Sequence, residues 1–489
     1  MNILLVIFFF LINLITLSKN ELIFVELQSR HGARGPLDLD IEGRDKIGQK
    51  WEYPGELTGV GQRMEYILGR RNRYRYITNT YHFLKEKYDP HELLVLSTSL
   101  NRTLLSMTSQ LQGLYPMIEE NAEKLDQKQI EFSKPPVKCE DEDIKKEINN
   151  LNDLSLPNYM NIIPIHMIHP SEKKIAVYDY TDCKPIVENI TNKNRDENVY
   201  LNSLRKYFIG NYSKPLNDYL HFPDNFTFEF DDIGKICDAV IADYTEGKDL
   251  DEFIEKTNID LDILIDECKN ILGSSFRDKL YGDENKTVLL LEESMVLKEM
   301  IYYMKLRVDA DIEGIADKID KNVSDYSRPK MVIISGHDTT LAAQIIYLIK
   351  IFKLDINIYK LPTYTAQVAV EVTREDDIKE KNYSNYNVSF YFNDDLFFNI
   401  TMDKFIETVE KNIWTSEQID KFCYVENNNK DNNKNKSKNN KISLKTIILI
   451  SISILVVCLL IVIIFLVIKI FTKEDEEVES IDSDALINE

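Results

Sequence analysis

The chain has 489 residues, of which 44% are hydrophobic and 29% charged, and this composition excludes disulfide-rich mini-proteins and wholly disordered chains. Its 59 basic and 81 acidic residues give a formal net charge of −22, so no overall positive field attracts a nucleic-acid backbone. The length fits two or three ordinary domains, or one large α/β domain with an insertion.

The first predicted element is an apolar run at residues 3–17. It is short for a membrane span and lies at the very start of the chain, so residues 1–18 are predicted to be a secretory signal peptide. An uncleaved anchor and a buried first strand are the alternatives. A cleaved signal predicts that the body of the chain, residues 21–425, crosses a membrane during synthesis.

Three segments of the body share one pattern, a short apolar run that ends in polar residues. The runs are residues 22–27, 92–96 and 331–334. The polar residues after them include Arg30, His31, Arg34, Arg102, His337 and Asp338. Such runs, followed by turns and helices, are typical of buried parallel strands, and ligands bind parallel sheets beyond the carboxyl ends of the strands. We therefore expect these six side chains to form one site.

The types of these side chains indicate phosphate chemistry. Guanidinium groups match the paired oxygens of a phosphate and stay charged at any working pH. His31 lies between two arginines, whose charge should depress its pKa and keep one ring nitrogen neutral for attack on phosphorus. Asp338 could carry a proton to a departing alkoxide. These roles predict two-step phosphoryl transfer through a phosphohistidine, with water as the final acceptor and no metal or other cofactor.

The same residues, with several stretches in order between them, resemble the histidine acid phosphatases, a branch of the histidine phosphatase superfamily. Residues 29–36 (SRHGARGP) are similar to the RHGxRxP signature, and residues 335–341 (SGHDTTL) to the HD element. The corroborating stretches are residues 56–63, 68–76, 97–116 and 163–166. The resemblance covers most of residues 21 to about 423. It implies that His31 is the nucleophile and Asp338 the proton donor. The phosphate ligands that it implies are Arg30, Arg34, Arg102 and His337.

The resemblance also implies a fold and a branch. The fold is a doubly wound α/β domain with a mostly parallel sheet and a smaller helical domain inserted within about residues 120–320. Residues 127–150 and 250–272 of that region look helical and acidic. Asp338 stands where phytases and inositol-polyphosphate phosphatases usually carry the alanine of HAE, which favours the prostatic and lysosomal acid-phosphatase branch. Residues 281–287 replace a Gly-Gly-containing segment of the family, so the preferred leaving group stays open.

Two smaller patterns have structural explanations that compete with functional ones. His166 and His169 have H-x-x-H spacing without a third ligand in view, so we expect structural histidines rather than a metal site. Residues 61–76 carry five arginines and predict a solvated helix face, with one arginine at the substrate entrance as the alternative.

Secretion predicts disulfides and glycans. Five cysteines allow two disulfides with one left over, in pairings that the sequence does not specify: Cys139, Cys183, Cys237, Cys268 and Cys423. N-x-S/T sequons begin at Asn189, Asn211, Asn225, Asn285, Asn322, Asn382, Asn387, Asn399 and Asn435. Asn101 begins another, which we predict to be unmodified because a glycan beside Arg102 would obstruct the site.

The carboxyl-terminal part predicts a membrane anchor. Residues 446–468 carry no charge and are long enough for one transmembrane helix, after a polar Asn/Lys-rich stalk at 426–445. With the signal peptide this gives a single-pass type I protein, although the lysines of the stalk run against the positive-inside rule. Within the acidic cytosolic tail, 469–489, Asp482–Ile487 resembles a dileucine signal for a sorting adaptor. A lysosome- or endosome-like compartment and the cell surface are the two expected locations.

The sequence therefore predicts an acid phosphatase that hydrolyses phosphate monoesters of small molecules or phosphoproteins, with its active site luminal or extracellular. One alternative is a lipid-phosphate or inositol-phosphate phosphatase on the same site. Another is a catalytically silent surface binding glycoprotein. A carrier or receptor finds no support, because the predicted transmembrane helix has no ionisable residue. The oligomeric state stays open, a homodimer included.

Overall fold

The computed structural model of the chain describes residues 20–37, 51–133, 135, 142–168, 198–222, 226–281, 287–316, 328–356, 360–375 and 382–423. The predicted signal peptide, stalk, transmembrane helix and cytosolic tail lie outside these residues. Among the helices within them, none has both the length and the apolar character needed to cross a bilayer.

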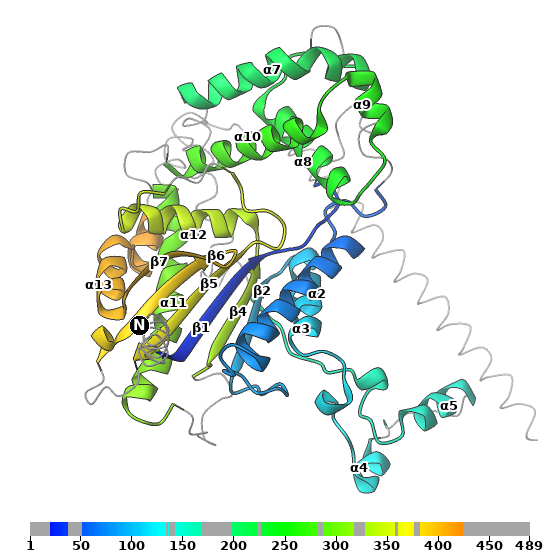
Figure 1. Ribbon diagram of the computed structural model, residues 1–489, viewed down its shortest axis with the longest axis vertical. Coiled ribbons are helices and arrows are strands. Elements are labelled where there is room, and N and C mark those ends of the chain that lie inside the picture. The colour runs from blue at the N-terminus through cyan, green and yellow to red at the C-terminus, as the bar shows by residue number, and fades with distance from the viewer. Residues whose placement is uncertain are drawn as a thin grey trace, which may run out of the picture. The chain divides into compact units, whose positions relative to one another are not determined.

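A seven-stranded sheet carries the body of the chain, with the strand order β3-β2-β4-β1-β5-β6-β7 (Figure 1). The strands are β1 (Asn20–Arg30), β2 (Leu93–Thr98), β3 (His166–Ile168), β4 (Met331–Gly336), β5 (Gln367–Glu375), β6 (Tyr386–Phe392) and β7 (Asp395–Thr401). Strand β4 pairs in parallel with both β1 and β2, and β2 pairs in parallel with β3. The three strands that the sequence predicts are thus confirmed, and they are direct neighbours.

The other half of the sheet is antiparallel, so the prediction of a mostly parallel sheet is wrong. Strand β5 pairs antiparallel with β1 and β6, and β6 pairs antiparallel with β7. A two-residue turn joins β6 to β7, and both of its residues, Asn393 and Asp394, have positive φ angles of 48° and 76°. Two such residues are typical of a type I′ hairpin, which can connect only antiparallel strands.

Between and after the strands, the chain forms helices and short helical turns. They are α2 (Gly59–Arg73), the π-helical turn η2 (Tyr74–Thr78), α3 (Asn101–Leu114), η3 (Glu119–Asn121), α4 (Gln127–Phe132), α5 (Glu142–Leu151), η4 (Pro157–Tyr159), α11 (Thr287–Ile312), α12 (Asp338–Ile351), η6 (Tyr383–Asn385) and α13 (Met402–Asn412). Helices α4 and α5 lie in the acidic stretch that the sequence predicts to be helical.

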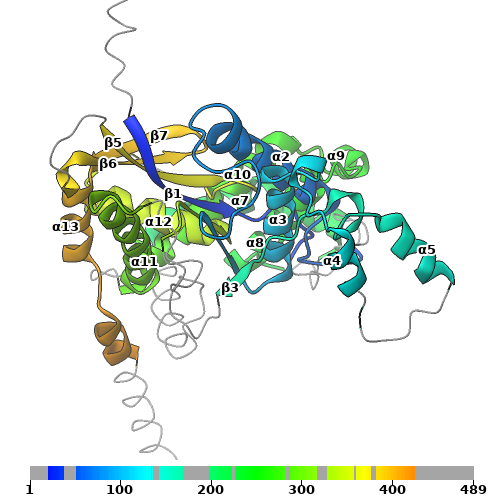
Figure 2. The ribbon, with the colours of Figure 1, turned by 90° about the horizontal axis from the view of Figure 1, so that it is seen from below.

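Helices cover both faces of the sheet, as a doubly wound domain requires (Figures 1 and 2). In β4, Val332 and Ile334 pack on one face against α11, α12 and α13, whereas Met331 and Ile333 pack on the other against α3 and η2. Because successive side chains of a strand point to opposite faces, a strand covered on both sides needs a continuous apolar run. This explains why β1, β2 and β4 could be predicted from short apolar runs alone, whereas the short β3, which is exposed at two of its three residues, could not.

Four further helices have a hydrophobic core of their own within the region of the predicted insertion. They are α7 (Val199–Leu220), α8 (Phe230–Thr245), α9 (Asp251–Thr257) and α10 (Leu261–Tyr281). A disulfide between Cys237 and Cys268 joins α8 to α10, and Cys423 is also disulfide-bonded. Helix α10 contacts α11 and α12, which connects this group of helices to the sheet.

Candidate active site

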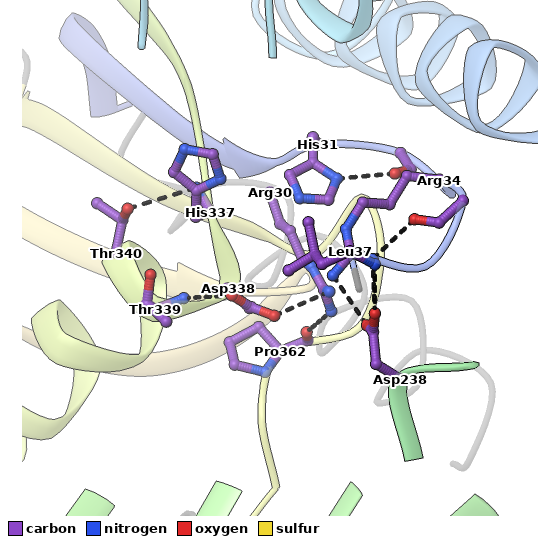
Figure 3. A network of polar contacts seen from close by, with 12 residues as sticks. Arg30, His31, Arg34, Leu37, Asp238, His337, Asp338, Thr339, Thr340 and Pro362 are labelled. Carbon is purple, nitrogen blue, oxygen red and sulfur yellow. Dashed lines mark hydrogen bonds and ion pairs between the residues drawn. The ribbon is translucent and has the colours of Figure 1, made fainter. Parts of the chain in front are cut away.

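The predicted site residues lie at the carboxyl ends of the three neighbouring parallel strands. Arg30 ends β1 opposite Gly336 of β4, and the backbone N–H of His31 donates to the carbonyl of Gly336 at 3.0 Å. His337 caps α12 and Asp338 begins it. Figure 3 shows Arg30, His31, Arg34, His337 and Asp338 gathered in one place. The sixth residue, Arg102, lies in the first turn of α3, which follows β2.

Two glycines bring the loop after β1 into direct contact with the start of α2. A Cβ atom on Gly32 would overlap the backbone of Gly61, and one on Gly61 would overlap the carbonyl of Ala33. Thr58 caps α2, since its hydroxyl accepts from the Gly61 N–H at 3.1 Å. The same hydroxyl is 3.2 Å from the Ala33 carbonyl, to which it donates. The loop that carries His31 is therefore held against the helix by backbone contact.

The ring of His31 has a defined tautomer. It is 2% exposed, and its Nδ1 lies 2.8 Å from the carbonyl oxygen of Gly32. A carbonyl only accepts, so Nδ1 carries the hydrogen and the neutral ring keeps a lone pair on Nε2. Burial, together with the charges of Arg30 and Arg34, holds the pKa of His31 well below 6.5. The ring therefore stays neutral at acid pH, with Nε2 available as a nucleophile.

Arg30 is fixed from three directions. One Nη atom lies 2.8 Å from the Asp338 carboxylate, and the other donates to the Pro362 carbonyl at 2.6 Å. Its guanidinium lies 4.3 Å from the centroid of the Tyr364 ring, a cation–π contact. The backbone N–H of Arg30 donates to Ala366 at 2.9 Å, so the segment after α12 holds both ends of this residue.

Arg34 and Arg102 differ in how their charge is balanced. Both Nη atoms of Arg34 donate to the carboxylate of Asp238, at 3.2 and 2.9 Å. Burial acts to lower the pKa of Arg34, but the charge of this carboxylate outweighs it and raises the pKa. Burial and the charge of Arg34 lower the pKa of Arg102 to about 10. Within the described residues, the buried Nε groups of Arg30, Arg34 and Arg102 have no hydrogen-bond partner. Three such donors suit an anion, because a buried N–H group without a hydrogen bond costs free energy that a bound anion would recover.

His337 takes part in a short chain of hydroxyl groups. Its Nε2 lies 3.1 Å from the hydroxyl of Thr98, which lies 2.8 Å from that of Thr103. The Thr103 hydroxyl has two carbonyl acceptors, those of Thr98 at 3.0 Å and Leu100 at 2.8 Å. The Thr103 hydroxyl has one hydrogen, which it donates to one of these carbonyls. It therefore accepts from the Thr98 hydroxyl, and the Thr98 hydroxyl in turn accepts from the Nε2–H of His337. Burial and the charge of Arg102 lower the pKa of His337 to about 4.

Asp338 is held by Arg30 and by the first turn of its own helix. One carboxylate oxygen accepts from the N–H of Thr339 at 2.8 Å, and the other pairs with Arg30. Burial acts to raise the pKa of Asp338, but the charges of Arg30 and Arg34 outweigh it and place the pKa below its ordinary value. A bound phosphate would offset those charges, which raises the pKa again.

Four residues of this network were not singled out from the sequence: Thr98, Asp238, Pro362 and Tyr364. Thr98 ends β2 and could have been found as a polar residue at the carboxyl end of a predicted strand. The other three come from α8 and from the segment after α12. Nothing in their local sequence indicates that they contact Arg34 and Arg30, from which they are separated by 204 residues or more.

The two smaller sequence patterns have structural outcomes. His166 is exposed on β3 and His169 lies outside the described residues, among which no cluster of three metal-ligating side chains is found. Arg63 and Arg70 are exposed on α2, but the prediction of a solvated face is wrong for Arg73 and Arg75. Arg73, the last residue of α2, is buried and donates to the Leu114 carbonyl at 3.0 Å. Arg75, in the π-helical turn, pairs with Glu371 at 2.7 Å.

The comparisons with known proteins agree with one another on the family. A family model described as histidine phosphatase superfamily (branch 2) matches residues 21–393. The lysosomal acid phosphatase of Xenopus laevis is 30% identical over 192 residues, which cover 39% of this chain and 35% of that protein. The chain thus spans about a third of that relative's length. The lysosomal acid phosphatase of Rattus norvegicus is 22% identical over 388 residues, which cover 78% of this chain and 72% of that protein.

A solved structure supports the fold. The phytase of Hafnia alvei in complex with tartrate matches with a TM-score of 0.50 at 12% identity, over 81% of this chain and 98% of that chain. At this identity the likeness is one of fold alone.

Proposed function

The chain belongs to branch 2 of the histidine phosphatase superfamily, and from this we propose that it is an acid phosphatase that hydrolyses phosphate monoesters through a phosphohistidine at His31. One observation carries the proposal. His31 presents a neutral Nε2 beside three arginines whose buried Nε groups have no partner among the described residues. A nucleophile next to preorganised cations suits attack on a phosphate better than any other common electrophile.

In the first step, Nε2 of His31 attacks phosphorus and the bond from phosphorus to the leaving oxygen breaks. Asp338 gives its proton to that oxygen, which leaves as an alcohol. Arg30, Arg34 and Arg102 stabilise the charge on the three remaining phosphate oxygens. The charge of the phosphate also raises the pKa of His337, so that this ring joins them as a cation when it takes up a proton. The Nδ1 hydrogen bond to Gly32 holds the ring in place while Nε2 forms the new bond.

In the second step, water attacks the phosphohistidine and the nitrogen–phosphorus bond breaks. The carboxylate of Asp338, which lost its proton in the first step, takes one from the water. Inorganic phosphate leaves, and His31 returns to its neutral form.

The direction of the two pKa shifts supports an acid working pH. His31 stays neutral as the pH falls, because its pKa lies well below 6.5. Asp338 must be protonated when the substrate is bound, and the phosphate charge helps it by offsetting Arg30 and Arg34. Activity therefore falls as the pH rises through the pKa of Asp338 in the substrate complex.

We also propose that residues 446–468 anchor the chain in a membrane with the active site luminal or extracellular. The apolar runs at both ends of the chain support this, as does the Cys237–Cys268 disulfide, since disulfides persist in oxidising compartments. The names of the relatives favour a lysosome-like location. The likeness to a phytase concerns the fold alone and does not favour inositol phosphates as substrates.

The test uses the full chain, purified in a mild detergent. Phosphate release from glycerol 2-phosphate, whose alkoxide needs a proton to leave, is followed from acid to neutral pH for the wild type, His31→Ala and His166→Ala, the last a control at an exposed histidine. We expect an optimum on the acid side and an acid-labile phosphoryl adduct on the chain, both lost in His31→Ala alone. A folded chain that binds inorganic phosphate without turnover would instead favour the binding glycoprotein.

A further inference from the structure

Asp238 places a negative charge of the inserted helices directly at the phosphate site. Its carboxylate accepts hydrogen bonds from both Nη groups of Arg34, at 2.9 and 3.2 Å, and from the backbone N–H of Leu37 at 2.8 Å. Figure 3 shows the Asp238 carboxylate beside Arg34 and Leu37, and the Asp338 carboxylate beside Arg30. The side chain of Asp238 is 23% exposed, so it lies at the border between the site and the solvent.

Glu56 places a second negative charge beside Arg102. Its side chain accepts from the amide of Asn101 at 3.1 Å, one residue before Arg102. Its backbone carbonyl accepts from the N–H of Gly35 at 3.0 Å, which ties it to the loop that carries Arg34. The charge of Glu56 acts to raise the pKa of Arg102, against the larger effect of burial.

The charges around the site are therefore balanced before any substrate binds. Three arginines face three carboxylates: Arg30, Arg34 and Arg102 against Asp338, Asp238 and Glu56. One phosphate group can accept hydrogen bonds from the three arginines, because their buried Nε groups have no partner among the described residues. A second anionic group on the leaving alcohol would meet Asp238 or Glu56 instead. Arg34 offers it little, since both of its Nη groups already bond Asp238.

We propose that Asp238 and Glu56 select the leaving group by its charge. The chain hydrolyses phosphate monoesters of neutral or cationic alcohols and discriminates against alcohols that carry a further phosphate or carboxylate. This rests on the proposed function and names its substrate class. The physical reason is that like charges placed close together weaken binding of the wrong partner, whereas opposite charges favour the right one.

The experiment compares kcat/KM for three substrates on the full chain: phosphocholine, glycerol 2-phosphate and 3-phosphoglycerate, whose leaving alcohols are cationic, neutral and anionic. The variants are Glu56→Gln and Asp238→Asn, and the matched control is Glu120→Gln, the same change at an exposed glutamate. The readout is the ratio of two rates on one preparation. The ratio does not depend on the fraction of folded enzyme, so a poorly folding variant still gives an answer.

We expect the wild type to prefer phosphocholine to 3-phosphoglycerate by about tenfold or more, because their leaving alcohols differ by two units of charge at close range to the carboxylates. Each of the two variants should narrow this ratio by roughly three- to tenfold, and Glu120→Gln should leave it unchanged. Equal use of the three substrates by the wild type, or an unchanged ratio in both variants, would overturn the proposal while leaving the phosphatase activity in place. No phosphate release from glycerol 2-phosphate would refute the activity itself, and the selectivity with it.

Discussion

Glu371 joins the sheet to η2 and the residues after it through a buried carboxylate, and replacing it by glutamine should destabilise the fold. One oxygen of this carboxylate accepts from Nε of Arg75 at 2.7 Å and from the hydroxyl of Tyr76 at 2.8 Å. Its other oxygen accepts from the hydroxyl of Tyr81 at 2.9 Å. The residue is 1% exposed, so solvent cannot replace these bonds. Glu371→Gln keeps the shape of the side chain and removes its charge.

The magnitude follows from the bonds that are weakened. Hydrogen bonds to a charged group contribute about 1.5–3 kcal/mol each, against about 0.5–1.5 kcal/mol for neutral ones. In Glu371→Gln, two hydrogen bonds from Arg75 and two from tyrosine hydroxyls lose the contribution of the negative charge. One of the two accepting oxygens also becomes an NH2 group, which cannot accept. Because the Arg75 side chain is 23% exposed, water recovers part of its loss. We expect the free energy of unfolding to fall by about 2–4 kcal/mol.

The assay is urea unfolding of the full chain, followed by the fluorescence of its two tryptophans, Trp51 and Trp414. The control is Glu375→Gln, at the exposed end of the same strand, which should change the free energy of unfolding by less than about 0.5 kcal/mol. If the two variants unfold at the same urea concentration, the carboxylate of Glu371 does not stabilise the fold and the reasoning fails.

Two further predictions concern the rate. Thr98→Val removes the partner of His337 Nε2 and should lower kcat/KM by about five- to tenfold, whereas Thr98→Ser should restore most of it; equal losses in both variants would contradict the role of the hydroxyl. Asp338→Asn should slow the hydrolysis of glycerol 2-phosphate far more than that of p-nitrophenyl phosphate, because p-nitrophenolate leaves without a proton. It should also abolish the fall in the rate of glycerol 2-phosphate hydrolysis toward neutral pH. A uniform loss on both substrates would show that Asp338 does not donate the proton.

The parallel strands β1, β2 and β4 and the gathering of the six candidate residues at their ends could be predicted because each depends on a local signal, whereas the short, mostly exposed β3 could not. A strand buried on both faces needs a run of apolar residues, and the polar residues at its end mark the ligand edge. The antiparallel strands β6 and β7 have no such signal, since β6 alternates buried and half-buried positions, β7 has no buried position, and the turn that joins them has no glycine. Asp238, Pro362 and Tyr364 act through tertiary contacts with Arg34 and Arg30, which the residues next to them do not indicate.

The position of β4 between β1 and β2 has a consequence for how the chain folds during synthesis. Val25 pairs with Met331, so the two strands are 331 − 25 = 306 residues apart in sequence. Leu93 of β2 also pairs with Met331, at a separation of 331 − 93 = 238 residues. At about 5–20 residues per second, β1 waits roughly 15–60 s and β2 roughly 12–48 s on the ribosome for the strand that joins them. Until then both present unpaired edges, which are prone to aggregation. We expect nascent chains that end before residue 331 to bind chaperones, and those that extend past β4 to be released.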